Sequence, residues 1–406
     1  FSKTTLEPPL GSGPYKITSV EPGTSITYER VEDWWAEDLP INKGRYNFDK
    51  LVYDYYRDSN VALEAFFLGE YDVREENTAK LWATAYDIEQ VKQGNIIKEE
   101  IRNKRPAGMQ GFIYNIRRDK FKDPEVRKAL GYAFDFEWSN KQFAYGAYKR
   151  TSSFFENSEL SARSGPPEGR VLEILETFRE DLPERVFEKR YQPPETDGSG
   201  KIRGNLRKAM RILEEAGYKL NDNNIRVHKE TGQKLEFELL AFNPQFERWV
   251  LPFLDNLKKT GVIGKLRLVD SAQYQNRLRD FEFDMTISTF PQSSSPGNEQ
   301  RDFWSSSKAN IKGSRNIIGI QNPVIDALIE KVINADSRKE LVYRTRALDR
   351  VLLANYYVIP QWHISKWRIA YQNRLGRPEN PAPYSLDITT SWWLADPAKT
   401  KYKLAE

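Results

Sequence analysis

The 406-residue sequence contains no cysteine, so disulfides, thiol nucleophiles, iron–sulfur clusters and Cys-ligated zinc are excluded. Its two histidines, His228 and His363, are too few for a His-rich metal site, and neither stands in a recognisable catalytic motif. No apolar run reaches the length of about 18 residues that a membrane-spanning helix needs. A basic excess is also lacking, because 62 Lys and Arg face 58 Asp and Glu, and this balance argues against a dedicated nucleic-acid binder.

Aromatic residues, in contrast, are abundant. They make up 13% of the chain, beside 39% hydrophobic and 30% charged residues, a mixture typical of a folded globular protein. At roughly 150 residues per domain, the length predicts two to three domains. The first residue is Phe1 and not Met, so we expect a start that was processed, truncated or engineered.

The first hundred residues favour antiparallel strands with one short helix. Residues 15–20 and 25–30 alternate in polarity around Glu21-Pro22-Gly23, which predicts a hairpin. Residues 51–56 are expected to form another strand, and a short helix is expected to follow, with Ser59 as its N-cap and Gly69 as its C-terminal stop. A short buried strand is predicted at residues 71–73.

A charged segment with Pro and Gly, RNKRPAGMQG at residues 102–111, separates two apolar stretches and is the candidate hinge between two lobes. Asp123-Pro124 predicts the start of a helix. Later helices are expected at residues 323–334 and 338–354, with Asn322 and Ser337 as their caps. Strands at residues 356–363 and 367–371 then return toward the first lobe.

Between these helices the chain alternates regularly between strand and helix. After a helix that ends near Gly217, strands are predicted at residues 234–242, 265–269 and 283–288, with helices at residues 246–259 and 272–279 between them. This order predicts an α/β fold with a largely parallel sheet.

The polar segment FPQSSSPGN, residues 290–298, follows the strand expected to end near Ser288. Ligands of open α/β sheets bind beyond the carboxyl ends of the strands, so this loop is well placed to offer hydroxyls and amides. A flexible surface loop is an equally good interpretation. Several tryptophans are open to two interpretations as well, stacking platforms or core residues: Trp34, Trp35, Trp138, Trp362, Trp367, Trp392 and Trp393.

Motifs in a fixed order resemble a known family. GSGPYKI, ERVEDWW, YDVREEN and FEFDMTIS followed by a polar loop are similar to the extracellular solute-binding proteins of peptide and nickel ABC importers, family 5. Four further segments resemble the YejA-type microcin C and peptide-binding subgroup: AFDFEWSNKQFAYGAYKRTSSFF, YQPP, NPVIDALIEKVI and RALDRVLLANYYVIPQWH. The resemblance covers essentially the whole chain.

The resemblance implies a type II periplasmic binding protein, an α/β fold of two lobes that closes at a hinge. Residues 1–105 would form lobe I, residues 106–364 lobe II, and residues 365–406 the return to lobe I with a C-terminal tail. Relatives usually carry a longer region before GSGPY, so we expect the N-terminal part of lobe I and an extra small domain to be absent from this chain. Strands of lobe I would then lack sheet partners.

The implied function is non-catalytic. A periplasmic subunit would capture a peptide or peptide-like ligand, then deliver it to an ABC permease in the inner membrane; it would act as a monomer, without metal or cofactor and without nucleic acid. Family members hold a free α-amino group with an Asp in the loop after the FEFDM-like strand, whereas this loop carries Gln or Ser there. A blocked, formylated or peptidoglycan-derived peptide is therefore expected.

The ligand-binding residues that we expect lie in both lobes. Polar groups and aromatic walls are what such pockets combine. On lobe I they are Glu76, Asn77 and Trp82; near the crossing and the first helix Asn115 and Tyr145; and on lobe II Phe290, Gln292, Ser293, Ser294, Asn298 and Trp304.

Two other classes of function stay open on the sequence alone. A glycoside-processing enzyme would need two essential carboxylates, and pairs such as Glu75-Glu76, Glu99-Glu100 and Glu214-Glu215 are frequent in a chain with 58 acids. A sugar-binding module with an aromatic cleft would bind oligosaccharides without closing at a hinge. Turnover that depends on a carboxylate would distinguish the enzyme from both binding proteins.

Overall fold

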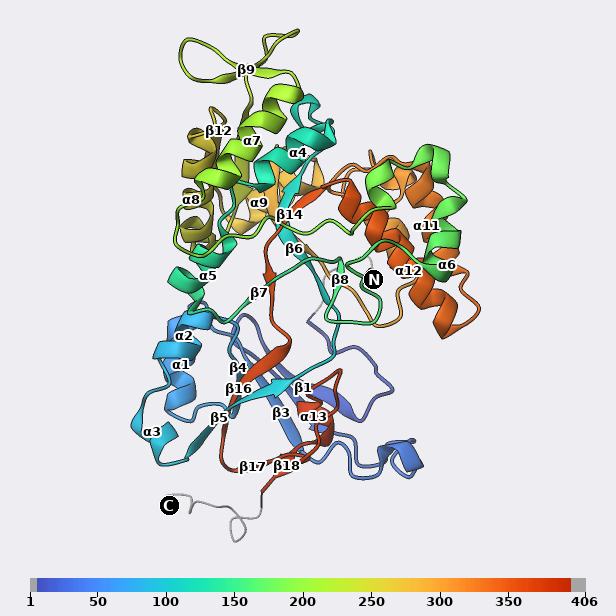
Figure 1. Cartoon of the computed structure of the whole chain (residues 1–406). Helices are drawn as coiled ribbons and strands as arrows, with labels where there is room; N and C mark the ends of the chain where they lie inside the picture. Colours follow the sequence, from blue (N-terminus) through green and yellow to red (C-terminus); the bar gives the residue numbers. More distant parts are fainter. Residues whose placement is uncertain (1–5, 396–406) are drawn as a thin grey trace. The chain divides into compact units, whose positions relative to one another are not determined.

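The computed structural model describes residues 6–395 and divides into two compact units. Unit 1 contains the described parts of Phe1–Lys104 and Lys366–Glu406, and unit 2 is Arg105–Ser365 (Figure 1). Residues 396–406 of the expected C-terminal tail lie outside the described residues. In the part of the chain that is described, no helix has the length and apolar character needed to cross a bilayer.

Unit 2 is built on a mixed sheet of six strands. Its main path runs in the order β12-β11-β13-β6-β14, and β8 (Phe155–Glu156) adds to β6. The bounds are Ile263–Leu268 for β12, Glu236–Ala241 for β11, Met285–Phe290 for β13, Ala107–Tyr114 for β6 and Val358–Pro360 for β14.

The prediction of a largely parallel sheet is correct for half of this path. Strand β11 is parallel to β12 and β13, which helices α8 (Glu247–Lys258) and α9 (Ser271–Arg279) connect in the expected way. Strand β6 pairs antiparallel with both β13 and β14. The prediction missed this because β6 enters from a segment more than a hundred residues earlier in the chain.

Strand β6 is buried on both faces. Met109 and Ile113 belong to the same apolar cluster as Ile325 of α11 (Pro323–Ile333) and Leu348 of α12 (Arg338–Ala354). Phe112, which points to the other face, stacks on Phe253 of α8 at a ring distance of 4.9 Å. Side chains alternate across a strand, so β6 joins the two apolar layers. Figure 1 shows α7 (Arg203–Glu215) and α8 on one side of this sheet and α11 and α12 on the other.

The helices of unit 2 begin where the capping residues predict. Asp123 accepts from the amide of Glu125 at the start of α4, Asn322 caps α11, and Ser337 caps α12. The helix bounds are Pro124–Gly131 for α4, Phe136–Ala144 for α5, Gly169–Glu176 for α6, Arg203–Glu215 for α7, Glu299–Trp304 for α10, Pro323–Ile333 for α11 and Arg338–Ala354 for α12.

Unit 1 holds two three-stranded antiparallel sheets. The first has the order β1-β2-β3, with β1 at Tyr15–Glu21, β2 at Ser25–Arg30 and β3 at Lys50–Asp54, and it confirms the predicted hairpin. The second has the order β4-β16-β5, with β16 (Lys366–Gln372) between β4 (Val73–Glu75) and β5 (Ile96–Arg102). Strand β3 is an edge strand, and Val52 and Tyr53 on it are exposed.

The smaller elements of unit 1 refine two predictions. Helix α1 (Ser59–Phe67) is capped by Asp58, whose carboxylate accepts from the amides of Asn60 and Val61, and not by Ser59. Strand β4 begins at Val73, two residues after the predicted start. The remaining elements are α2 (Ala79–Thr84), α3 (Glu89–Lys92), α13 (Ile388–Ser391), β17 (Leu375–Gly376) and β18 (Trp393–Leu394).

The chain passes between the units twice, after β5 and before β16. The first passage occupies residues 103–106 only, because residues 107–111 of the expected hinge already belong to β6. The second follows β15 (Trp362–His363), which pairs with β7 (Lys149–Arg150) inside unit 2.

Candidate functional site

One edge of the unit 2 sheet collects the ends of several strands. Phe290 at the end of β13 is paired with Met109 near the start of β6, and Pro360 at the end of β14 is paired with Gly111. Since β11 is parallel to β13, it ends at this edge as well. We call this the carboxyl edge of unit 2. Ligands of α/β sheets bind beyond such an edge.

The backbones come unusually close at this edge, and two glycines allow it. A Cβ atom on Gly108 would lie 2.0 Å from the carbonyl oxygen of Phe290, and one on Gly111 would lie 2.6 Å from that of Ile359. Any side chain at either position would push β13 or β14 away from β6. The positions of the loops after β13 and β14 therefore depend on these glycines.

Four aromatic rings form a stack beside the carboxyl edge. Trp362, directly after β14, stacks on Trp249 at 3.9 Å and on Tyr148 at 5.6 Å, and Phe246 lies 6.3 Å from the Trp362 ring. Trp249 is buried, whereas the other three are partly exposed. The stack gives this edge an apolar wall of the kind that ligand pockets use.

Sequence reasoning did not select this aromatic stack. Trp362 was one of several tryptophans with an open assignment, and Tyr148 and Phe246 were not considered. Both lie more than a hundred residues from Trp362, so no local pattern connects them. Phe246 stands at the predicted start of the helix over residues 246–259, and Tyr148 lies near no predicted strand or helix, so neither position signals a ligand contact.

Two buried amide groups near the carboxyl edge have an unused donor. Gln361 accepts from Gln110 through Oε1 at 2.8 Å, and Gln292 accepts from Gln300 at 2.7 Å. Within residues 6–395, Nε2 of Gln292 and Nε2 of Gln361 have no hydrogen-bond partner. An unpaired buried donor costs free energy, so each of these covered amides would gain stability from a carbonyl partner that a rearrangement brought within reach.

His363 follows Trp362 and is held as a neutral ring. Burial lowers its pKa, Glu156 opposes this effect, and Lys149 adds to it. Its Nδ1 atom lies 3.3 Å from the hydroxyl of the buried Thr151. At neutral pH the ring therefore contributes a hydrogen-bonding surface without charge.

The polar loop after β13 is present, as expected. Ser293, Ser294 and Asn298 are exposed on it. Asn298 accepts from Arg301 at 2.6 Å, and the hydroxyl of Ser293 accepts from the amide of Ser295 at 3.2 Å. Among the described residues, no group of three His, Asp or Glu side chains could hold a metal ion.

Phe290 and Trp304 are placed in the core and not on the wall of a pocket. The strand extends two residues further than predicted, so Phe290 is the last residue of β13 and not the first of the loop. Its ring lies 4.6 Å from that of Trp304, which is fully buried and donates to Gln300 at 2.9 Å. Both expectations require correction, because neither ring faces solvent.

Asn115 lies at the opposite edge of the sheet. It follows Tyr114, which pairs with the first residue of β13, and about six residues of strand, roughly 20 Å, separate it from Met109. Its amide donates to the carbonyls of Phe281 and Phe283, at 3.1 and 2.9 Å. Asn115 thus holds the segment that leads into β13. The expected contact with a ligand backbone is wrong, because these two carbonyls already take up its amide group.

Glu76 in unit 1 is likewise a structural residue. Its buried carboxylate pairs with Arg74 at 3.0 Å and accepts from the amide of Thr78 at 2.8 Å. These partners occupy both oxygens, so the expected contact with a cationic or amide group of a ligand is not available without breaking the ion pair.

Three further expected residues, Asn77, Trp82 and Tyr145, are at least partly exposed. Asn77 is exposed, and Trp82 is half-buried with Lys98 Nζ 4.6 Å from its ring centre. Burial lowers the pKa of Lys98.

In unit 2, Tyr145 ends α5 in the left-handed conformation with φ of 55° and exposes its ring. A left-handed conformation is uncommon for a tyrosine.

One family model and two known proteins match the sequence over most of its length. The family model "Bacterial extracellular solute-binding proteins, family 5 Middle" matches residues 1–312. The "Probable peptide-binding protein YejA" of Agrobacterium fabrum is 48% identical over 97% of this chain and 64% of its own length. The "Peptidoglycan-binding protein YepA" of the same organism is 36% identical over 97% of this chain and 65% of its own length. The chain thus spans less than two thirds of these relatives.

A solved structure shows the same fold. The oligopeptide-binding protein AppA of Bacillus subtilis, in complex with a nonapeptide, superposes with a TM-score of 0.67 at 21% identity, over 95% of this chain and 67% of that one. The expected type II periplasmic binding protein fold is therefore confirmed. By the match of the family model over most of its length, the chain belongs to the family 5 bacterial extracellular solute-binding proteins.

Proposed function

We propose that this protein is the substrate-binding subunit of an ABC importer for oligopeptides or peptide-like compounds, and that it acts in the periplasm or on the outer face of the membrane. The observation that carries the proposal is the 48% identity to a probable peptide-binding protein over nearly the whole chain. The carboxyl edge of unit 2 supports it, because it combines an aromatic wall with unpaired amide donors. Such a protein performs no chemistry of its own.

Capture would occur by closure of the two units. The chain passes between them only twice, which is the connectivity of a hinge. A ligand that contacts both units stabilises the closed form by the contacts that exist only in that form. The closed protein would then dock as a monomer on a membrane permease.

The peptide backbone would be recognised by neutral groups. Gln292 and Gln361 have Nε2 donors for ligand carbonyls, and Ser293, Ser294 and Asn298 add hydroxyl and amide groups. Trp362 would pack against ligand side chains. From unit 1, Asn77 and Trp82 would complete the contacts, with Tyr145 of unit 2 as an exposed ring.

The ligand would have a blocked or otherwise uncharged amino end. Residues 290–298 include no acid, and the first one that follows, Glu299, is engaged by the amide of Gly297 at 2.9 Å. An ammonium group buried here would have no anion to pair with. N-formylated peptides avoid this cost, and so do peptidoglycan fragments whose peptide is still joined by an amide to muramic acid; the similarity to a peptidoglycan-binding relative agrees with the second class.

Two measurements test the proposal. Native mass spectrometry of gently purified protein should show a bound species of peptide or muropeptide mass. Calorimetry with one tripeptide in formylated and free-amine forms should then show saturable binding, without turnover, and at least tenfold tighter for the formylated form. A bound oligosaccharide, or hydrolysis of any ligand, would contradict the proposal. Equal affinity for the two forms would contradict only the blocked amino end.

A further inference from the structure

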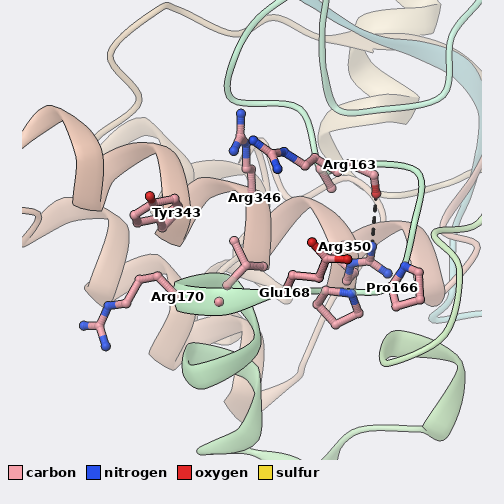
Figure 2. Close-up of a pocket in the computed structure, with 11 residues that line it drawn as sticks. Arg163, Pro166, Glu168, Arg170, Tyr343, Arg346 and Arg350 are labelled. Carbon is pink, nitrogen blue, oxygen red and sulfur yellow. Dashed lines mark hydrogen bonds between the residues drawn. The ribbon is translucent and has the colours of Figure 1, made fainter.

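A second hollow of unit 2 lies between α12 and the segment that leads into α6 (Figure 2). Its volume is about 280 Å³. None of the residues in the proposed peptide site contributes to its lining. The charged side chains that line it are four arginines and one acid: Arg163, Arg170, Arg346, Arg350 and Glu168.

Arg350 forms a rigid, positively charged floor. Its guanidinium is buried and donates to the carbonyls of Val186 at 3.2 Å, Glu188 at 2.8 Å and Arg163 at 3.0 Å, and also to that of Gly165. Figure 2 shows the bond to Arg163. Burial, with a smaller effect of Arg190, lowers the pKa of Arg350 to about 10. These carbonyls hold the side chain in place. They carry no negative charge, and within residues 6–395 no carboxylate pairs with the guanidinium.

Arg163 and Arg346 stand next to each other at the rim. Figure 2 shows their guanidinium groups side by side, one from the loop and one from α12. Arg346 donates through Nε to the carbonyl of Glu159 at 2.9 Å. Burial lowers its pKa, and the charge of Arg163 lowers it further, while the carboxylate of Glu159 acts against this. That carboxylate is itself paired with Arg338 at 2.6 Å.

Neither rim arginine forms an ion pair with a carboxylate within residues 6–395. Arg170 differs, because it pairs with Glu173 and Glu340, both at 3.0 Å. Two adjacent guanidiniums repel each other unless an anion lies between them, and a guanidinium binds carboxylate or phosphate oxygens in a two-pronged geometry. The first three residues of α6, Gly169, Arg170 and Val171, also line this hollow.

We propose that this hollow binds a small oxyanion, a phosphate or a compact carboxylate, held between Arg163 and Arg346. Arg350 supplies the fixed positive floor beneath it. Glu168, which is exposed, is the one lining group that opposes an anion and therefore limits the affinity. The site uses no residue of the proposed peptide site, so it stands or fails independently of that function.

Calorimetry on the whole chain tests the site, with inorganic phosphate and citrate as probes and chloride adjusted to constant ionic strength. We expect Arg163→Gln to weaken binding at least tenfold without disturbing the fold, because Arg163 is exposed and its guanidinium forms no hydrogen bond or ion pair with residues 6–395. Glu168→Gln should strengthen it severalfold. Arg211→Gln, an exposed arginine on α7 paired only at 3.7 Å, removes the same charge elsewhere and should change affinity less than twofold.

The affinities for the two probes identify the class of oxyanion. A tenfold preference for phosphate indicates a phosphate site, and a tenfold preference for citrate indicates a carboxylate site. Circular dichroism and thermal melting without added anion should give the same curves for the wild type and Arg163→Gln. Absence of saturable heat with both probes would overturn the proposal. Equal weakening by Arg163→Gln and Arg211→Gln would overturn it as well, because the effect would then be one of net charge.

Discussion

Asp349 on α12 accepts a hydrogen bond of 2.7 Å from the hydroxyl of Ser153, although 196 positions separate them in the chain. The same carboxylate accepts from the amides of Phe154 at 2.8 Å and Ala162 at 2.9 Å. One buried side chain therefore fixes both ends of the segment that contains β8 and fastens it to the core of unit 2. Burial raises the pKa of Asp349 to about 6, and the three hydrogen bonds oppose this shift.

Asp349→Asn should alter the pH dependence of stability in one direction. The folded pKa is higher than the ordinary value of 3.8, so the folded state binds the proton more tightly than the unfolded state. The resulting stabilisation is fully present below about pH 4 and is lost as the pH rises through 6. Urea unfolding at pH 4.5, 5.5 and 7 should show the wild type losing roughly 2 kcal/mol relative to Asp349→Asn between the lowest and the highest pH. Parallel pH curves would contradict this.

Trp304→Ala is expected to damage stability and not a ligand contact. The ring is fully buried against Phe290 and Phe154, and its removal should lower the free energy of unfolding by about 3 to 5 kcal/mol. Trp304→Phe, which keeps most of the packing, should lose less and retain the wild-type affinity for peptide. If Trp304→Phe lost affinity for peptide while its stability stayed unchanged, Trp304 would contact the ligand and this prediction would be wrong.

The sequence was a sufficient guide where the determinants are local. Asp123, Asn322 and Ser337 precede amphipathic helices, and the amides at those helix starts have to be capped, so their roles follow from a few neighbouring residues. The hairpin around Glu21-Pro22-Gly23 is local for the same reason.

The arrangement of the site could not be predicted in this way. Whether Asn115 and Gln292 share an edge depends on the antiparallel pairing of β6 with β13, a contact between segments about 170 residues apart that no local pattern specifies. The burial of Phe290 depends on where β13 ends, and a shift of two residues moves it from loop to core. The rings stacked around Trp362 come from three segments that are distant in the chain, around residues 148, 249 and 362. Only the folded structure brings them together.

Arg150→Met should be neutral or stabilising. The guanidinium of Arg150 is buried over the rings of Phe134 at 4.8 Å and Phe136 at 5.3 Å, and within the described chain none of its nitrogens has a hydrogen-bond partner. Burial lowers its pKa to about 10. Replacing such a charge with an apolar side chain of similar length removes a desolvation cost, and we expect a gain of about 0 to 3 kcal/mol in chemical unfolding.

Arg127→Met is the matched control for this prediction. Arg127 is also buried in unit 2, but it donates to the carbonyls of Phe121 at 2.5 Å, Lys122 at 2.8 Å and Asn355 at 2.6 Å. Its loss leaves those carbonyls unpaired and should cost about 2 to 4 kcal/mol. If both substitutions destabilise the protein equally, Arg150 has a partner of comparable strength and the prediction fails.

Gln361→Met should weaken peptide binding about tenfold and lower the free energy of unfolding by about 1 kcal/mol, because Nε2 of Gln110 loses its acceptor on Gln361. The substitution keeps the length of the side chain but removes the Nε2 donor, which within residues 6–395 has no partner to lose. One neutral hydrogen bond to a ligand contributes about 1 kcal/mol, somewhat more when it is buried. Gln142→Met, at an exposed position on α5, is the control. Calorimetry that shows equal affinity for the two variants would remove Gln361 from the site.

Ser293→Asp tests why the loop after β13 lacks an acid. Ser293 is exposed at the position where we expect related binders to hold a free α-amino group, and a carboxylate there would pair with the ammonium of an unblocked peptide. Free-amine tripeptides should bind at least tenfold more tightly to this variant, whereas formylated ones should gain nothing. Ser295→Asp places the same charge two residues along the loop and should improve neither class. A gain for both classes of peptide, or for neither, would show that residue 293 does not face the amino end of the ligand.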